Sequence, residues 1–326
     1  MMSECAFRFC VAPMMEWTDR HYRYLVRLMS RHTRLYTEMV TTGALIHGER
    51  ERFLKYNSAE HPIALQVGGS DPDAMRQSAE WGELAGYDEI NINVGCPSDR
   101  VQSGRFGVCL MREPEQVAAC VRAMRGSTDL PVSVKCRIGV DHEDSYAFLR
   151  VFIDTVASAG CNIFILHARK AWLQGLSPKQ NREVPELNYA RVYQLKKDYP
   201  HLTIVINGGI QTLPEIHSHL KNVDGVMVGR LAYKHPQLLL QIDQALFGAA
   251  QPPTSDLHGV VVKYIDYVET NLSQGVPLNS MTKHILNLYQ GVPGAKQWRR
   301  HLSENSHKSG LGTELIAQAH TKLMGG

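Results

Sequence analysis

The sequence lacks any long uninterrupted apolar run, although 44% of its 326 residues are hydrophobic. A membrane-spanning helix needs about 20 such residues in succession, so no transmembrane segment is predicted. Residues 1–12 carry charge at Glu4 and Arg8 and do not have the apolar centre of a signal peptide. We therefore expect a cytoplasmic protein with no membrane association and a large hydrophobic core.

Paired cysteines are also lacking. The seven cysteines are odd in number, scattered, and never spaced as CxxC: Cys5, Cys10, Cys96, Cys109, Cys120, Cys136 and Cys161. Free thiols in a reducing compartment are the simplest interpretation. No Cys/His pair has zinc-finger spacing, so no metal site is predicted. A glycine-rich dinucleotide fingerprint, internal repeats beyond a β/α unit and low-complexity tracts are absent as well.

The sequence does contain a regular alternation of short β-branched runs and longer segments of helical period. The strands are predicted at residues 7–12, 35–37, 63–67, 89–93, 132–137, 163–167, 203–207 and 225–228. The helices are predicted at residues 19–30, 42–49, 72–85, 114–125, 143–159, 189–198, 213–220 and 237–247. Eight strand–helix units imply parallel strands and predict a (β/α)8 TIM barrel over residues 1–250. An open doubly wound sheet is the alternative.

The C-terminal part of the sequence has a different pattern. The segment 251–255 (Gln-Pro-Pro-Thr-Ser) has the composition of a linker. Only helical patterns follow it, at residues 256–271, 278–287, 296–304 and 313–324. We therefore predict a small all-helical domain over residues 251–326.

Polar or small residues close nearly all of the predicted strands, at the end where barrel enzymes place their chemistry. A barrel that served only as a core would not need them, although caps and turns would explain two or three. They are Ala12, Pro13, Met14, Met15, Glu38, Gln66, Asn93, Cys96, Lys135, Arg137, His167, Arg169, Asn207, Gly208, Gly209, Gly229 and Arg230.

Two of these strand ends suit a phosphate, and others suit a flavin ring. Asn207-Gly208-Gly209 and Gly229-Arg230 follow the seventh and eighth strands, where backbone N–H groups can approach an anion. Gln66 offers a donor and an acceptor to a pyrimidine edge, and Lys135 suits the negative charge of a reduced flavin. The segment 12–14 would supply backbone contacts and an apolar wall. A salt-bridged surface lysine is the alternative for Lys135, but it shares a face with Ser133, opposite two valines.

Cys96 follows the fourth strand within three residues and lies in a loop shaped by Gly95 and Pro97. Inert burial is the usual fate of a free cysteine, but this position faces the barrel mouth. As a proton donor, Cys96 should remain a thiol until it acts. A nucleophilic role would need a partner base, and no such histidine is evident.

The motifs occur in the order and spacing of the tRNA-dihydrouridine synthases, and the whole chain resembles that family, most closely the bacterial DusA subfamily. The matching segments are 12–19 (APMMEWTD), 66–69 (QVGG), 93–98 (NVGCPS), 99–104 (DRVQSG), 134–137 (VKCR), 167–169 (HAR), 207–210 (NGGI), 229–230 (GR) and 297–300 (QWRR).

The resemblance implies an FMN-dependent enzyme that uses NADPH to reduce a D-loop uridine of tRNA, of the U20/U20a type, to 5,6-dihydrouridine. Hydride would pass from flavin N5 to C6 while Cys96 protonates C5. The implied flavin contacts are Pro13, Met14, Met15, Gln66, Lys135, His167, Asn207, Gly208, Gly209, Gly229 and Arg230. Asn93 would hold the target base, and the other implied tRNA contacts are Lys179, Arg182, Lys296, Arg299 and Arg300. We expect a monomer with no protein partner.

The charge distribution agrees with a nucleic-acid partner even though the formal net charge is only +3. Residues 20–55 hold eight Lys/Arg against three acids, and residues 168–200 hold seven against three. These two segments predict a phosphate track, with solvated helix faces as the alternative. A uracil would have to leave its stack to reach a barrel mouth.

Two rival functions remain open from sequence. One is an FMN barrel acting on a small molecule such as dihydroorotate or an enone; the helical domain and basic segments argue against it. The other is a non-catalytic RNA-binding barrel, against which the flavin-type strand ends argue.

Overall fold

The computed structural model describes residues 5–98, 101, 104–249 and 251–324. The chain forms two compact units. The first comprises residues 1–15, 34–56 and 61–228, and the second comprises residues 16–33, 57–60 and 229–326. The predicted division into residues 1–250 and 251–326 stays a prediction. It cuts the chain once, whereas each of these units contains several separate segments of the chain.

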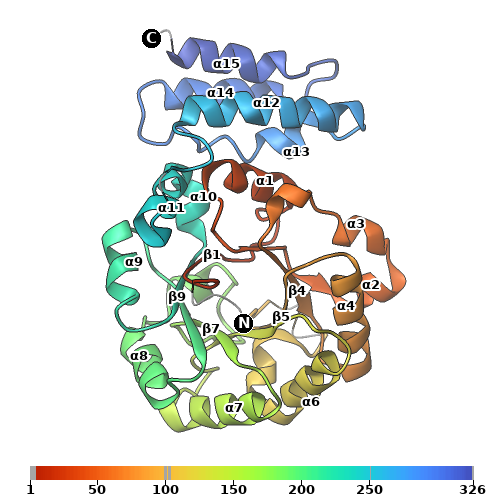
Figure 1. Cartoon of the computed structure of the whole chain (residues 1–326), viewed down its shortest axis with the longest axis vertical. Coiled ribbons are helices and arrows are strands. Elements are labelled where there is room, and N and C mark those ends of the chain that lie inside the picture. The colour runs from red at the N-terminus through yellow and green to blue at the C-terminus, as the bar shows by residue number, and fades with distance from the viewer. Residues whose placement is uncertain (1–4, 99–100, 102–103, 250, 325–326) are drawn as a thin grey trace. The chain divides into compact units, whose positions relative to one another are not determined.

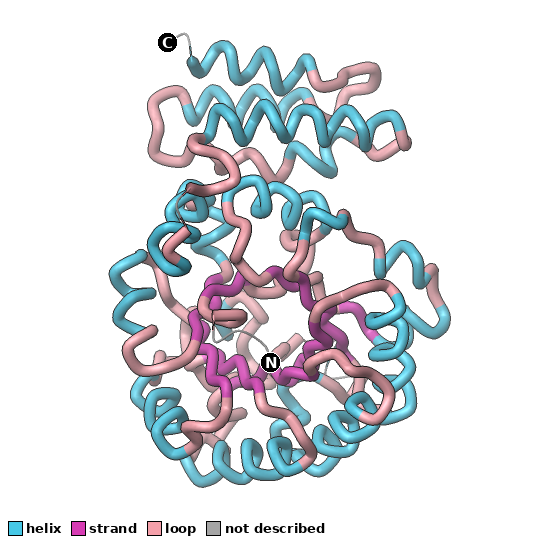
Figure 2. The backbone as a smooth tube through the Cα atoms, in the orientation of Figure 1, coloured by secondary structure: helices cyan, strands magenta, loops and turns pink. Residues whose placement is uncertain are grey.

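The first unit is a closed barrel of parallel strands, as predicted (Figures 1 and 2). Around the barrel the strands pair in the order β1 (Phe9–Val11), β9 (Gly225–Val228), β8 (Thr203–Asn207), β7 (Ile163–His167), β6 (Val132–Arg137), β5 (Glu89–Val94), β4 (Ile63–Gly68) and β2 (Leu35–Tyr36). Arg34 closes the ring: its N–H donates to Phe9 O at 3.0 Å, and its carbonyl accepts from Val11 N–H at 3.0 Å. The alternative of an open sheet is therefore wrong.

The second barrel position differs from the prediction of one strand, because two short strands fill it. Both β2 and β3 (Val40–Thr41) pair with β4. Between them the Thr37 hydroxyl oxygen accepts the hydrogen bond of the Gln66 N–H at 3.0 Å, in place of a backbone carbonyl. The side chain thus interrupts the ladder, and the chain leaves and rejoins β4.

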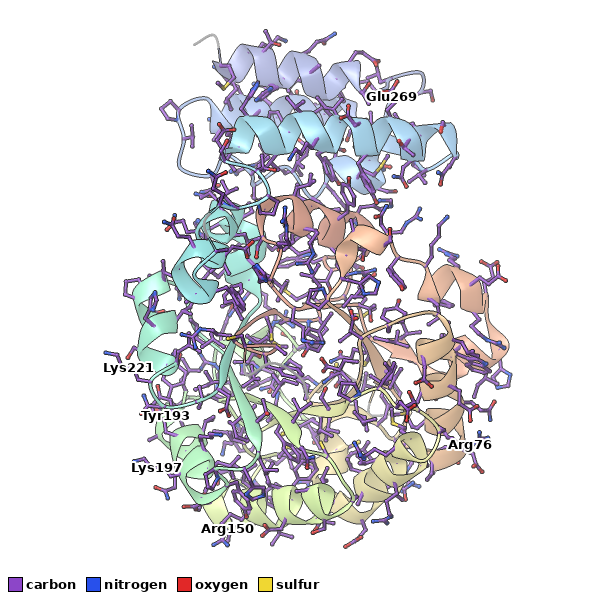
Figure 3. The ribbon with its side chains drawn as sticks, viewed as in Figure 1. Arg76, Arg150, Tyr193, Lys197, Lys221 and Glu269 are labelled. Atoms are coloured by element: carbon purple, nitrogen blue, oxygen red, sulfur yellow. The ribbon has the colours of Figure 1, made fainter. Side chains whose placement is uncertain are left out.

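Helices surround the barrel (Figure 1). In the first unit they are α2 (Thr42–His47), α3 (Arg50–Leu54), α4 (Pro72–Leu84), α6 (Pro114–Arg125), α7 (Tyr146–Ser158), α8 (Tyr189–Asp198) and α9 (Leu213–His219), with 3₁₀ turns η2 (Gly107–Arg112) and η3 (Gln180–Arg182). Their outer faces carry polar side chains such as Arg76, Arg150 and Lys197, which point away from the barrel (Figure 3).

Local chemistry explains where two of these helices begin. Asp71 caps α4 by accepting from Ala74 N–H at 2.8 Å, ahead of a proline in the first turn. The start of α7 was predicted too early, at Glu143. Ser145 caps this helix instead, accepting from Phe148 N–H at 3.0 Å.

The core of the barrel has an apolar part and a polar part. The apolar part draws on β1, β2, β4, β7, β8 and β9 and on residues next to them, and it includes Cys10, Ala12, Tyr36, Ala64, Ile163, Ile165, Val205 and Met227. The polar part comes from β4, β5 and β6 and includes Gln66, Glu89, Asn91, Asn93, Ser133 and Lys135. Buried polar groups need partners, so this part of the barrel is organised by hydrogen bonds.

The second unit is helical. It contains α1 (Arg20–Met29), η1 (Ser58–Glu60), α10 (Arg230–Lys234), η4 (Pro236–Leu238), α11 (Leu239–Phe247), α12 (Leu257–Ser273), α13 (Leu278–Thr282), α14 (Ala295–Asn305) and α15 (Glu314–Met324). The predicted C-terminal helices are present, although α13 is shorter than expected, and α10 was not predicted.

Residues far apart in the sequence hold the second unit together. Asp19 caps α1 by accepting from two backbone N–H groups, and it also bonds His284 at 2.8 Å and Lys283 at 3.0 Å. The His21 ring bonds the Tyr267 hydroxyl at 2.8 Å. These contacts place α1 against the C-terminal helices. Among the described residues, no helix has both the length and the apolar character needed to cross a membrane.

Candidate active site

The C-terminal ends of β4, β5 and β6 bring together four of the predicted site residues. Asn93 on β5 lies beside Lys135 on β6, and its Nδ2 donates to Gln66 Oε1 on β4 at 2.9 Å. Asn93 Oδ1 accepts from the backbone N–H groups of Gly95 at 3.1 Å and Cys96 at 3.0 Å. Asn93 therefore links the end of β4 to the loop that carries the cysteine.

The Cys96 loop is held on several sides. The Cys96 carbonyl accepts from Val108 N–H at 3.0 Å, and the Gly95 carbonyl accepts from Arg137 Nε at 2.9 Å. Gly107 has a φ of +76°, and a Cβ there would lie 2.6 Å from the Cys96 carbonyl oxygen. Only glycine fits this close approach.

The thiol of Cys96 is partly exposed and donates to the Ser98 hydroxyl at 3.4 Å. Among the described residues it makes no hydrogen bond to a histidine. A nucleophilic cysteine normally has such a base beside it. The surroundings of this thiol favour the predicted proton donor over a nucleophile.

Burial separates Cys96 from most of the other cysteines. Cys10, Cys120, Cys136 and Cys161 are buried. Burial raises the pKa of Cys120, Cys136 and Cys161 to about 12 in each case, and it raises the pKa of Cys10 further. These four thiols are therefore inert packing groups at neutral pH.

Lys135 and Arg137 bring positive charge to this end of the barrel. Burial, with the charge of Arg137, lowers the pKa of Lys135 to about 8, and burial lowers the pKa of Arg137 to about 10. Lys135 Nζ donates to Asn207 Oδ1 at 3.3 Å. Within the described ranges neither cation pairs with a carboxylate, so the alternative of a salt-bridged surface lysine is wrong. Desolvated cations without counter-ions are suited to an anionic ligand or intermediate.

His167 and the glycines after β8 adjoin this group. Burial and the charges of Arg137 and Lys135 hold the pKa of His167 well below its usual range, so the ring is neutral. Gly208 and Gly209 have φ of +117° and +72°, and a Cβ on Gly208 would lie 2.6 Å from His167 Cδ2. Their N–H groups donate to no protein acceptor within the described residues, which fits the predicted anion contact.

The remaining predicted flavin contacts are placed as follows. Pro13, Met14 and Met15 follow β1, and Met15 is 58% exposed. Gly229 and Arg230 follow β9 directly and begin α10, which belongs to the second unit. Their assignment to a phosphate stays a prediction.

The loop after β7 carries two of the predicted tRNA contacts. Lys179 and Arg182 are exposed and lie at η3. Asn181 between them is fully buried and bonds Trp172 through both ends of its amide, at 2.8 and 2.9 Å. Its carbonyl accepts from Arg137 Nη1 at 3.0 Å. The sequence did not reveal this organising role, because an asparagine in an irregular loop carries no distinguishing pattern.

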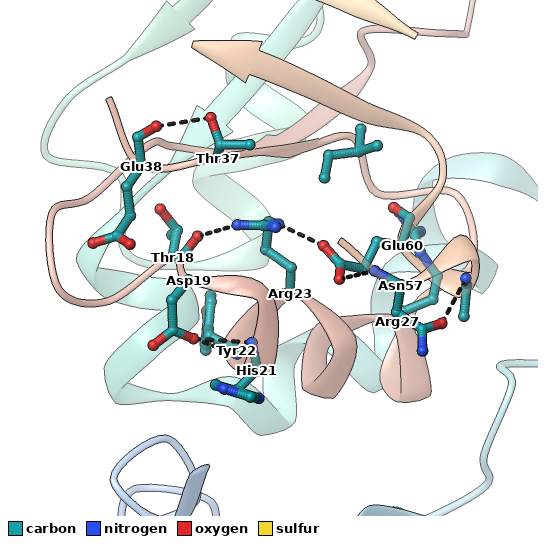
Figure 4. Close-up of polar contacts among 12 residues, drawn as sticks. Thr18, Asp19, His21, Tyr22, Arg23, Arg27, Thr37, Glu38, Asn57 and Glu60 are labelled. Carbon is teal, nitrogen blue, oxygen red and sulfur yellow. Dashed lines mark hydrogen bonds and ion pairs between the residues drawn. The ribbon is translucent and has the colours of Figure 1, made fainter. Parts of the chain in front are cut away.

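Three of the eight basic residues in segment 20–55 are buried and cannot belong to the predicted phosphate track, which stays a prediction for the exposed basic residues of that segment. Arg23 pairs with Glu60 at 2.6 Å (Figure 4), and Arg34 pairs with Glu89 at 3.0 Å. Arg27 donates to the carbonyls of four residues, Ser30, Arg31, Thr33 and Glu60. All three arginines are buried. The correction is that these cations hold the fold together, which a count of charges cannot distinguish.

The predicted tRNA contacts near the C-terminus are exposed on α14. Arg299 donates to Gln290 Oε1 at 2.6 Å, Arg300 pairs with Glu304 at 2.9 Å, and Lys296 is exposed beside them. Their role stays a prediction. Asp99, Arg100, Gln102 and Ser103 of the motif 99–104 lie outside the described residues.

Comparison with known proteins agrees with the resemblance seen in the motifs. The profile of the dihydrouridine synthase family matches residues 10–323. The tRNA-dihydrouridine(20/20a) synthase of Vibrio cholerae serotype O1 is 58% identical over 317 residues, which cover 97% of this chain and 96% of that protein. The protein of the same name from Escherichia coli K12 is 58% identical over 313 residues, covering 96% and 90%.

A solved structure resembles the chain in fold alone. The complex of 2-naphthoyl-CoA reductase with 2-naphthoyl-CoA gives a TM-score of 0.56 at 10% sequence identity. The match covers 76% of this chain and 51% of that chain, so this chain spans about half the length of the reductase structure.

Proposed function

The chain belongs to the dihydrouridine synthase family, and from that premise we propose that it reduces uridine in the D-loop of tRNA, at positions 20 and 20a, to 5,6-dihydrouridine. The two relatives described above carry that activity in their names, and the chain matches nearly their full length. The rival that acts on a small molecule and the non-catalytic rival have no such support.

FMN is the proposed bound cofactor, with NADPH as its reductant. When bound, FMN would supply a hydride from its N5 atom to C6 of the uracil. The observation that best supports FMN is a group of two desolvated cations close to a neutral His167 and to the N–H groups of Gly208 and Gly209. Among the described residues the cations have no carboxylate partner and these N–H groups have no protein acceptor. The residues of the barrel unit that would hold FMN are Pro13, Met14, Met15, Gln66, Lys135, His167, Asn207, Gly208 and Gly209.

Cys96 is the proposed donor of the proton to C5. Its thiol is partly exposed and is held as a hydrogen-bond donor to Ser98. Loss of the proton leaves a thiolate. Lys135 and Arg137 interact electrostatically with Cys96, so their positive charges would stabilise this thiolate. Asn93 is the proposed contact to the target base, with Lys179, Arg182, Lys296, Arg299 and Arg300 as contacts to the rest of the tRNA.

NADPH and tRNA are proposed to use the same face of the flavin in turn, because the sequence has no dinucleotide-binding fingerprint. Competition between tRNA and NADPH in steady-state kinetics would support this order, and a ternary complex would contradict it. We further propose that the protein acts as a monomer in the cytoplasm.

The proposed function is tested by nucleoside analysis of tRNA from a strain that lacks the gene. We expect dihydrouridine to be lost at positions 20 and 20a and retained elsewhere. An unchanged modification profile would refute the function. A purified protein that is colourless and cannot be reconstituted with FMN would refute the cofactor.

A further inference from the structure

A continuous series of side-chain hydrogen bonds runs along the inner face of β4, β5 and β6. Asn93 Nδ2 donates to Gln66 Oε1 at 2.9 Å, and Gln66 Nε2 donates to Asn91 Oδ1 at 2.7 Å. Asn91 Nδ2 donates to Ser133 Oγ at 2.7 Å, and the Ser133 hydroxyl donates to Glu89 Oε1. We call these five residues the amide relay.

Both ends of the amide relay fix its direction. At one end Asn93 Oδ1 accepts from two backbone N–H groups, those of Gly95 and Cys96. At the other end the Glu89 carboxylate accepts from Ser133, from the Tyr36 hydroxyl at 3.2 Å and from Arg34 at 3.0 Å. A backbone N–H cannot accept. Burial raises the pKa of Glu89, but the Arg34 cation at 3.0 Å holds it as a carboxylate, which cannot donate. Each amide between them therefore has only one satisfied orientation.

Burial makes the alternative orientations costly. Glu89, Asn91 and Ser133 are fully buried and Gln66 is 1% exposed. A donor or acceptor left without a partner here therefore cannot form a hydrogen bond with water instead. Reversing one amide would require every amide up to Asn93 to reverse. The Nδ2 group of Asn93 would then face the backbone N–H groups of Gly95 and Cys96, so that donors would face donors.

We propose that Glu89 is a positioning residue which, through the amide relay, fixes the amide of Asn93 and with it the Cys96 loop. Both lone pairs of Asn93 Oδ1 are already used, so this side chain offers the barrel mouth only an N–H donor. It would therefore meet a carbonyl oxygen of the target ring and disfavour a ring that presents an amino group there. This consequence for the ring rests on the proposed function.

Two variants separate the relay from the ion pair below it. Ser133→Ala and Tyr36→Phe each remove one hydroxyl that donates to Glu89, and both leave the Arg34 pair intact. Only Ser133 leads on to Asn91 and the Cys96 loop. Glu89→Gln is a poorer choice, because it disrupts a buried ion pair and endangers folding.

The measurement is hydrogen exchange of the Gly95 and Cys96 backbone amides in the purified holoenzyme, with kcat on tRNA alongside. For Ser133→Ala we expect exchange to quicken about 10-fold and kcat to fall about 10-fold, because a buried group loses its partner. For Tyr36→Phe we expect the exchange rates of the two amides and kcat on tRNA to stay within about 2-fold of the natural protein.

Equal effects of the two variants, or no effect of Ser133→Ala on exchange, would overturn the proposal. The exchange comparison does not need activity on tRNA. If the natural protein formed no dihydrouridine, the proposed function would fail while exchange still decided the relay.

Discussion

Cys96 is held by its backbone, so a substitution of its side chain removes the thiol and little else. We expect Cys96→Ala to retain its flavin and to accept hydride from NADPH as the natural protein does. Turnover on tRNA should fall by roughly 100- to 10,000-fold, the range for lost acid catalysis. Stopped-flow reduction by NADPH and single-turnover assays on tRNA measure the two steps separately. Full activity on tRNA in this variant would remove Cys96 from the mechanism.

Lys135 is expected to lower the stability of the fold at neutral pH, since its cation is desolvated beside Arg137. In the folded protein its pKa is about 8, against 10.5 for an ordinary lysine. Between these values the unfolded chain binds more protons, so this group makes stability rise as pH rises through that window. Below pH 8 the full destabilisation is present.

Lys135→Met should therefore stabilise the protein at pH 7 by about 1–2 kcal/mol, a figure reduced from the full shift because the side chain is partly exposed. It should also slow the reduction of the flavin. Urea unfolding at pH 7 and pH 9.5 tests the first part, and the gap between variant and natural protein should narrow at the higher pH. A destabilised variant at pH 7 would contradict this account of Lys135.

At the residue scale, the strand-end rule predicted which residues gather at the site. Gln66, Asn93, Cys96 and Lys135 close consecutive strands, and parallel strands must bring their ends together. Glu89 and Asn181 were not predictable in the same way. Their roles depend on hydrogen-bond partners in other strands and loops, which no spacing in the sequence identifies.

At the scale of elements, α1 shows what buried arginines do in this fold. Arg23→Met would leave Glu60 buried without its cation, and burial already raises the pKa of that carboxyl. We expect a loss of about 3–5 kcal/mol, the range for breaking a buried pair. Chemical unfolding measures it.

Arg52→Met is the matched control, because Arg52 pairs with Glu49 at 3.7 Å and both side chains are 78% exposed. This variant should change stability by less than about 0.5 kcal/mol. If Arg23→Met and Arg52→Met lowered the free energy of unfolding by the same amount, the assignment of Arg23 to the stability of the fold would be contradicted.

The strands were predictable because their β-branched runs stand between turn-forming residues, and most bounds agree within a residue or two. The predicted second strand agrees with β2 within one residue, but β3 was not predicted, because a Thr37 hydroxyl replaces a ladder bond between the two. The grouping of α1 with the C-terminal helices was also hidden. It depends on Asp19 meeting His284, a contact between residues 265 positions apart.

At the scale of the whole molecule, tRNA binding should depend on salt through a few exposed cations. Lys296→Ala, Arg299→Ala and Arg300→Ala should each weaken binding of tRNA and lower the slope of log affinity against log salt by about 1. Reduction of the flavin by NADPH should not change. Lys221→Ala, on an outward-facing side chain (Figure 3), is the control and should leave the slope unchanged. Unaltered slopes in all three α14 variants would remove this helix from the tRNA interface.

We propose that this chain reduces uridine in tRNA with Cys96 as the proton donor. The most direct measurement incubates the purified protein with NADPH and tRNA that lacks dihydrouridine, and maps the product by position. We expect dihydrouridine at positions 20 and 20a with the natural protein and almost none with Cys96→Ala at equal flavin content. Absence of dihydrouridine with the natural, flavin-loaded protein would contradict it.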